Sequence, residues 1–175
     1  MMKQKLLSSS LIVALMFGLP LQLASAATYS NGTATTTFTV TLTLNANCSI
    51  SATPLNFGSN GVLATAINQQ TTVAVTCTNT TPYNVGLDAG TVTGSTVTSR
   101  LMAGTATGNT ATTVGFQLYQ DAGHATPWGN TQGTNTASGT GTGSAQSIVV
   151  YGQVPAQTTP KPDTYQTTVT ATVYF

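Results

Sequence analysis

The stretch Phe38-Thr-Val-Thr-Leu-Thr-Leu-Asn-Ala-Asn-Cys48-Ser-Ile50 places an apolar residue at every even-numbered position. Strict alternation predicts a β-strand with one apolar face, because successive side chains of a strand point to opposite faces. A strand over residues 38–50 would span roughly 43 Å at about 3.3 Å per residue, about twice the usual strand length. We therefore ask which core so long a strand packs against, and whether that core lies in the same molecule.

The first residues have the pattern of a cleaved export signal. Lys3 and Lys5 form a basic start, residues 11–17 are a short apolar run, and Ala-Ser-Ala at 24–26 supplies a small-residue cleavage pattern. A membrane anchor is disfavoured because the apolar run is too short to cross a bilayer. The sequence predicts a signal peptide over residues 1–26 and export through the periplasm, with no integral membrane segment after cleavage.

Charged residues are scarce, at 4% of the chain against about 25% in an ordinary domain. After the predicted signal peptide only Arg100 and Lys161 are basic. The chain therefore has no basic stripe for nucleic acid and no polybasic patch for anionic lipid. Uncharged polar residues replace the charges, and such a surface repels its own copies only weakly. This composition excludes nucleic-acid binding and favours a protein that contacts its own kind.

Residues for catalysis or metal binding are equally few. One histidine, His124, and three aspartates cannot easily assemble a catalytic triad or a metal site. Asp88 and Asp121 could form a carboxylate pair for glycoside cleavage, but capping of turns near Gly90 and Gly123 explains both. We predict neither an enzyme nor a cofactor.

Cys48 and Cys77 are the two cysteines of the chain. In an exported protein a disulfide is the default prediction. The alternatives, a two-cysteine metal site or a thiol nucleophile, would need histidine and carboxylate partners that are barely present. A bond that closes a loop of about 30 residues contributes roughly 3–4 kcal/mol in the chain-entropy model.

Short alternating runs punctuated by Gly, Asn and Pro continue to the end of the chain, and none is typical of a helix. After the opening stretch we expect strands over residues 71–78, 83–88, 97–102, 113–120, 148–154 and 165–175. Residues 121–147 are interpreted as a long surface loop tethered by Trp128, because a glycine-rich phosphate cradle would need a strand-then-helix context and a lysine. Six or seven strands is the count of an immunoglobulin-like sandwich.

The last run has no sequence after it. It alternates through Val169, Ala171, Val173 and Phe175, and an immunoglobulin-like sandwich needs one further strand beside it. With a surplus strand in front and a vacancy behind, the economical solution is exchange, in which the front segment of one copy fills the vacancy of the next. The predicted fold is an all-β, incomplete immunoglobulin-like β-sandwich that lacks its last strand and is completed by donor-strand exchange. Because donor and acceptor sites differ, the contact is head-to-tail and builds a fibre.

A series of short motifs extends over the chain after the predicted signal peptide. In chain order they are Asn47-Cys48-Ser49, Leu55-Asn-Phe-Gly58, Val75-Thr-Cys77-Thr78, Leu87-Asp-Ala-Gly90, Arg100-Leu-Met102, Phe116-Gln-Leu-Tyr119-Gln-Asp121, Trp128-Gly129, Val150-Tyr-Gly-Gln-Val-Pro155 and Tyr165…Val169…Val173-Tyr-Phe175. Together they resemble the spore coat protein U domain, the module of archaic (Csu-type) chaperone–usher pilus subunits. The family usually shows Gly-x-Tyr-x-Asp before its last strand, and here Asp163 and Thr167 take the Gly and Asp places.

The resemblance implies a pilus subunit that a periplasmic chaperone holds, an outer-membrane usher receives, and neighbouring copies polymerise by donor-strand exchange. Similar subunits form thin pili for surface attachment and biofilm formation. Residues 27–45 would be the donor segment and residues 46–175 the pilin domain. The donor residues would be Phe38, Val40, Leu42 and Leu44. The C-terminal strand gripped by the chaperone would carry Val169, Ala171, Val173 and Phe175.

Two rival interpretations remain open at the level of sequence. One is a self-contained secreted carbohydrate-binding adhesin domain, in which Trp128 could stack on a sugar. The other keeps the fold and makes the chain a minor adaptor or a spore-coat-like secreted protein. A chain with both a donor segment and a vacancy can repeat indefinitely, which favours a shaft subunit.

Overall fold

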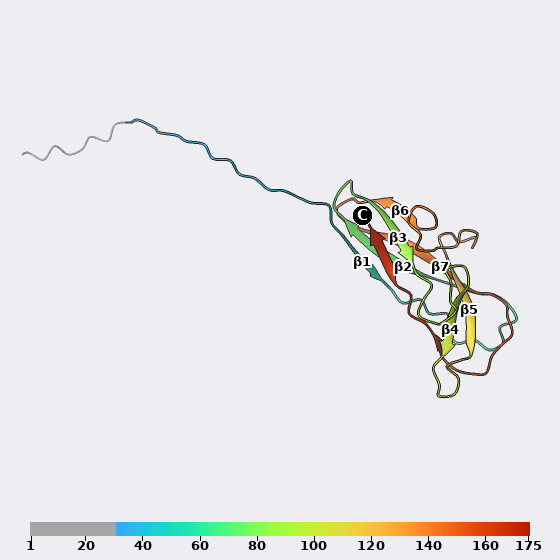
Figure 1. The fold of residues 1–175 in the computed structure, drawn as a ribbon. Helices are drawn as coiled ribbons and strands as arrows, with labels where there is room; N and C mark the ends of the chain where they lie inside the picture. The colour runs from blue at the N-terminus through green and yellow to red at the C-terminus, as the bar shows by residue number, and fades with distance from the viewer. Residues whose placement is uncertain (1–30) are drawn as a thin grey trace, which may run out of the picture. The chain divides into compact units, whose positions relative to one another are not determined.

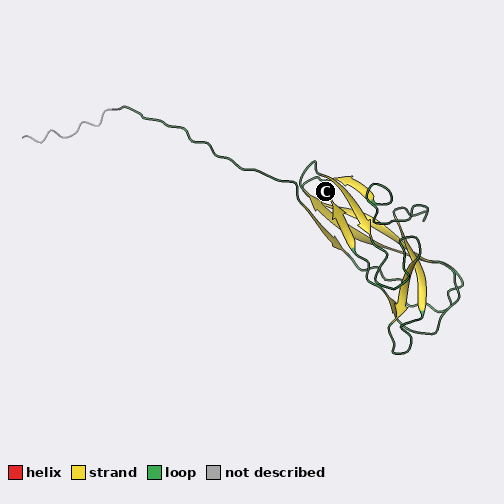
Figure 2. Ribbon diagram, in the orientation of Figure 1, coloured by secondary structure: helices red, strands yellow, loops and turns green. Residues whose placement is uncertain are grey.

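The computed structural model describes residues 31–175, and the predicted signal peptide over residues 1–26 lies outside the described residues (Figure 1). Every regular element in the described residues is a β-strand, as predicted (Figure 2). In chain order the strands are β1 (Cys48–Ala52), β2 (Ile67–Cys77), β3 (Pro82–Leu87), β4 (Arg100–Gly104), β5 (Thr113–Tyr119), β6 (Ala137–Thr140), β7 (Ala145–Val154), β8 (Tyr165–Gln166) and β9 (Ala171–Tyr174). Residues 31–175 accordingly hold no helix that is long and apolar enough to cross a membrane.

The strands form two sheets. One has six strands in the order β1-β2-β7-β5-β4-β8, and the other has three in the order β6-β3-β9. All of the pairings are antiparallel. Cys48 and Cys77 lie opposite each other on β1 and β2 and form the predicted disulfide, which excludes a thiol or metal role for either.

The core between the sheets follows the alternation of the sequence. Val73, Val75 and Cys77 of β2 are at most 2% exposed, and Tyr83 and Val85 of β3 are at most 4% exposed. Alternate side chains of β5 and β7 complete this layer, namely Val114, Phe116, Leu118, Val150 and Val154. Full burial of each such side chain stabilises the fold by about 1.5–3 kcal/mol.

The opening stretch of alternating residues becomes a strand only at its end. β1 starts at Cys48, and residues 31–47 belong to no strand. Pairing between β1 and β2 ends in a last rung in which the Thr78 amide donates to the Asn47 carbonyl oxygen at 2.9 Å. The chain then turns at residues 78–81, with Thr80 at a φ of 63°, so β2 offers no partner to the residues before Asn47.

The C-terminal run is not one strand, and the prediction of a single strand over residues 165–175 is wrong. β8 pairs with β4 in the larger sheet, whereas β9 pairs with β3 in the smaller one. Residues 167–170 cross from one sheet to the other, as happens at a corner of a sandwich where a strand changes sheets. Val169 therefore lies in the crossing, and Phe175 follows β9 with 58% of its surface exposed.

The interpretation of residues 121–147 as a surface loop is also wrong in part. This stretch contains β6, which pairs with β3, and the first residues of β7. Trp128 is fully buried and its Nε1 donates to the Val85 carbonyl oxygen at 2.8 Å. It anchors the stretch, as predicted, but as part of the core. Its ring is therefore unavailable to stack on a sugar.

Candidate strand-binding groove

An open groove runs along the core of the sandwich. One wall is formed by Ala52 at the end of β1 and residues 53–55 after it, and the other by residues 166–169 together with Ala171. The groove has a volume of about 470 Å³. Its floor is made of core side chains, namely Val73, Leu87, Met102, Phe116, Leu118 and Val150. Apart from Met102 these floor side chains are at most 6% exposed, so the groove lies over a packed apolar layer between the two sheets.

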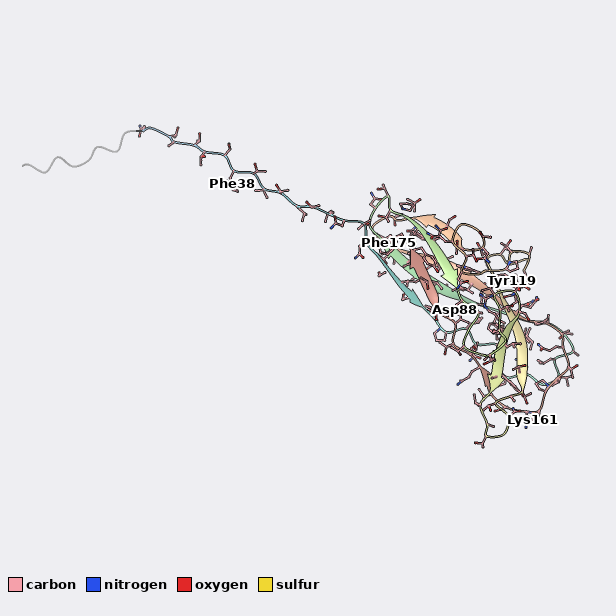
Figure 3. The ribbon with its side chains drawn as sticks, viewed as in Figure 1. Phe38, Asp88, Tyr119, Lys161 and Phe175 are labelled. Atoms are coloured by element: carbon pink, nitrogen blue, oxygen red, sulfur yellow. A yellow bond between two sulfur atoms is a disulfide. The ribbon has the colours of Figure 1, made fainter. Side chains whose placement is uncertain are left out.

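A second hollow of about 390 Å³ continues the groove. The two hollows share Leu55, Phe57, Met102 and Tyr165. Beyond these side chains the lining becomes more polar, with residues 159–164 and the exposed Lys161 among them (Figure 3). It still contains the apolar side chains of Leu63, Ile67, Val114 and Val154. Within residues 31–175 no cluster of His, Cys, Asp or Glu could hold a metal ion. The groove is thus apolar along its middle and more polar at one end, which suits an extended apolar segment better than a small polar ligand.

Two outer strands border this groove. β1 is the outer strand of the larger sheet, and β9 is the outer strand of the smaller one. The amide of Asp88 donates to the carbonyl oxygen of Thr170 at 3.0 Å, so Thr170 faces β3. Because backbone groups point alternately to the two edges of a strand, those of Val169, Ala171 and Val173 point to the open edge. The groove therefore has apolar side chains on its floor and unpaired backbone groups on its wall.

The predicted donor residues and the predicted chaperone-facing residues differ in environment. Phe38, Val40, Leu42 and Leu44 are 80–85% exposed, and Figure 3 labels Phe38. Val169, Ala171 and Val173 are half-buried and pack against the core. The first set is an apolar row in contact with water, and the second lies along the groove and its edge.

Arg100 is a structural centre that sequence reasoning did not single out. Its side chain is 0% exposed, and burial lowers its pKa to about 10 while nearby Asp88 acts in the opposite direction. Its guanidinium donates to the carbonyl oxygens of Leu87, Asp88, Val97 and Trp128 and to Oε1 of Gln117. These bonds tie β3 of one sheet to β4 and β5 of the other. The signal in the sequence was that Arg100 is one of only two basic residues after the predicted signal peptide.

The aspartates that could have formed a catalytic pair cap turns instead, as predicted. Asp88 accepts from the Gly90 amide at 2.9 Å. Asp121 accepts from the Ala125 and Thr126 amides, and these bonds lower the pKa of the Asp121 carboxyl. His124 is not fully solvated, because its ring packs edge-on against Tyr119 with 5.0 Å between ring centroids.

The two residues that depart from the family pattern also have local structural roles. Asp163 accepts from Nδ2 of Asn109 and from the Ala106 amide, and these bonds lower the pKa of its carboxyl. Thr167 Oγ1 accepts from the Thr91 amide at 3.2 Å. The first departure fixes the polar end of the groove, and the second fixes its wall.

Comparison with known proteins agrees with this arrangement. The model of the Spore Coat Protein U domain matches residues 34–172. Among solved structures, one similar chain belongs to the CsuC–CsuE chaperone–tip adhesion subunit pre-assembly complex from the archaic chaperone-usher Csu pili of Acinetobacter baumannii. The TM-score is 0.54 at 24% identity, and the match covers 76% of this chain and 40% of that one. This similarity supports the all-β, immunoglobulin-like fold. Curated proteins yield no match.

Proposed function

The chain belongs to the Spore Coat Protein U domain family, and we propose that it is a structural, non-enzymatic subunit of a chaperone–usher pilus that polymerises by donor-strand complementation. One observation carries the proposal. The chain has an exposed row of alternating apolar side chains in residues 38–44 and an open groove whose floor is made of apolar core side chains. The similar solved chain comes from a pilus pre-assembly complex, which supports the same role here.

The segment and the groove match in chemistry. Residues 38–44 would span roughly 23 Å when extended. Residues 31–47 contain no charged side chain, so their insertion would bury no unpaired charge. Burying four large apolar side chains would contribute about 1.5–3 kcal/mol each before the cost of ordering the segment. Backbone hydrogen bonds to the open edge of β9 would add affinity, as in other cases of strand addition.

The directions of β1 and β9 indicate how copies would join. The end of β1 and the start of β9, Ala52 and Ala171, both line the groove, and the two arrows point in opposite directions (Figure 1). A donor antiparallel to β9 would bring the neighbouring body to the polar end of the groove, away from Asn47. A parallel donor would crowd that body against the acceptor's own emerging segment. We therefore propose an antiparallel donor, which permits open head-to-tail growth.

The proposal includes partners at each stage of export. An open apolar groove beside an unpaired strand edge favours aggregation, so a periplasmic chaperone would cover it before assembly. The chaperone would pair with the run that holds Val169, Ala171, Val173 and Phe175. An outer-membrane usher would then receive the subunit, and neighbouring copies would extend the fibre at the cell surface, where it supports attachment and biofilm formation.

A pair of neighbouring substitutions tests this function. Leu42→Asp would place an unpaired charge in the apolar groove of the next copy, a large penalty, and should abolish fibres seen by electron microscopy while chaperone binding persists. Thr41→Asp lies on the opposite face of the strand and should still assemble. Equal assembly of both variants, or loss of chaperone binding in Leu42→Asp, would contradict the proposal.

A further inference from the structure

The loop after β3 holds the groove wall by a set of hydrogen bonds. The Asp88 amide donates to the Thr170 carbonyl oxygen at 3.0 Å, and the Thr170 amide donates back to Oδ1 of Asp88 at 2.9 Å. The same Oδ1 accepts from the Gly90 amide at 2.9 Å. One carboxylate therefore joins the loop after β3 to the segment that crosses between the sheets (Figure 3 labels Asp88).

The carboxylate takes the place of a backbone acceptor that is already occupied. In a regular antiparallel ladder the Thr170 amide would donate to the Asp88 carbonyl oxygen. That oxygen instead accepts from Nε of Arg100 at 2.8 Å. The carboxylate of Asp88 thus accepts from the Thr170 amide in place of the backbone oxygen that Arg100 occupies. It extends the pairing of β3 with β9 by one residue pair.

Two threonines extend this contact beyond Asp88. The Thr91 amide donates to Oγ1 of Thr167 at 3.2 Å, and the Thr168 amide donates to Oγ1 of Thr91 at 3.4 Å. Gly90 lies between the segments with a φ of +88°, and a Cβ there would be only 2.8 Å from Oγ1 of Thr167. The close approach of the two segments therefore requires glycine at this position.

We propose that Asp88 is a positioning residue for the acceptor groove. By holding Thr170 against β3, it turns the backbone N–H and C=O of Val169 to the open edge, in line with those of Ala171 and Val173. A donor strand then meets a prepared edge of three residues instead of two. This inference rests on the proposed function, and it adds the residue that sets the length of the binding edge.

The rate at which the acceptor groove releases a bound donor peptide measures this role of Asp88 directly. The probe is a fluorescently labelled peptide with the sequence of residues 33–46, and the acceptor is the chain from residue 27 to 175 carrying Leu42→Asp, so that it receives a strand but gives none. Asp88→Ala removes the acceptor of the Thr170 amide, whereas Asp88→Asn keeps an Oδ1 atom in its place. Both variants lose the charge, so the difference between them reports the hydrogen bonds that Oδ1 accepts from the Thr170 and Gly90 amides.

We expect Asp88→Ala to release the peptide about tenfold faster, and Asp88→Asn to stay within about twofold of its parent. Hydrogen exchange of the Thr170 amide should accelerate in Asp88→Ala alone. If Asp88→Ala does not fold, Thr91→Val replaces it, with about threefold faster release expected and the exposed Thr93→Val as its control.

The outcomes separate this inference from the function on which it rests. No capture by the Leu42→Asp parent would overturn the proposed groove function itself. Capture with equal release from the alanine and asparagine variants would overturn the role of Asp88 and leave the groove function standing. In the substitute pair, equal release from Thr91→Val and Thr93→Val would likewise overturn the positioning role.

Discussion

Residues 38–44 and residues 73–77 have the same alternation but opposite environments. Val73, Val75 and Cys77 are 0–2% exposed, whereas the four apolar side chains of the earlier stretch are 80–85% exposed. The later stretch has β1 on one side and β7 on the other. Residues 38–44 belong to no strand in the described chain. Alternation therefore identifies a face that needs a core, but it does not say which molecule supplies the core.

The largest expected change in the stability of the folded sandwich comes from substitution of Arg100. Arg100→Met would leave the carbonyl oxygens of Leu87, Val97 and Trp128 without this donor, and should lower the free energy of unfolding by about 3–5 kcal/mol. Urea unfolding of the monomeric Leu42→Asp chain measures it. Lys161→Met removes the other basic residue, which is exposed and makes one bond to Gly108, and should cost less than about 0.5 kcal/mol. Equal effects of the two variants would show that the buried network adds no stability.

The comparison between the two stretches can be made with identical substitutions. In the same monomeric chain, Val75→Ala should lower the free energy of unfolding by about 2 kcal/mol, because it leaves a cavity in the core. Val40→Ala should change it by less than about 0.5 kcal/mol, because Val40 is 83% exposed. In fibres of the parental chain, Val40→Ala should speed dissociation. A large effect of Val40→Ala in the monomer would place Val40 in its own core.

The smallest expected effect is a pH dependence of stability that arises in the folded sandwich and not in residues 31–47. Hydrogen bonds from Asn109 and Ala106 lower the pKa of Asp163 from its ordinary 3.8 in the folded chain. Its contribution to stability is therefore present above pH 3.8 and is lost as the pH falls through that value towards the lowered pKa. Thermal unfolding between pH 5 and pH 3 should show a smaller decline in Asp163→Asn. An equal decline would assign the dependence to other groups. Residues 31–47 contain no ionisable side chain, so proteolysis of this segment, corrected for the protease's own pH profile, should not change.

Much of the fold could be predicted from period-two patterns. Alternating apolar residues located β2, β3, β5 and β7 to within a few residues, and export chemistry predicted the disulfide between Cys48 and Cys77. The role of residues 38–44 and the presence of a groove could be inferred only together. The inference came from one strand too many at the front of the chain and one too few beside the C-terminal strand. The individual donor residues came from the family resemblance and stay a prediction, whereas alternation specifies only that their side chains share one face.

The remaining features depend on contacts that have no period. Trp128 is fully buried in the core and its Nε1 donates to the Val85 carbonyl oxygen, 43 residues earlier, a contact that no local pattern in the sequence indicates. Arg100 is buried because backbone carbonyls from distant segments converge on it. The segment that crosses between the two sheets is held by bonds to Asp88 and Thr91, which lie 82 and 77 residues before their partners.

The central claim is that residues 38–44 complete the groove of another copy, and one engineered chain tests it most directly. A copy of residues 33–46 appended after Phe175 through a short flexible linker would lie antiparallel to β9 and fill the groove within the same chain. The control carries the Leu42→Asp change in the appended copy. All chains in the comparison also carry Leu42→Asp in their own residues 38–44, so that none can fill the groove of another copy. The extended chain should be a monomer. Its Tm, measured by calorimetry, should exceed that of the control by about 10–20 °C, because burial of the appended apolar side chains adds several kcal/mol to the free energy of unfolding. Equal Tm values for the extended chain, its control and the unextended chain would contradict the account.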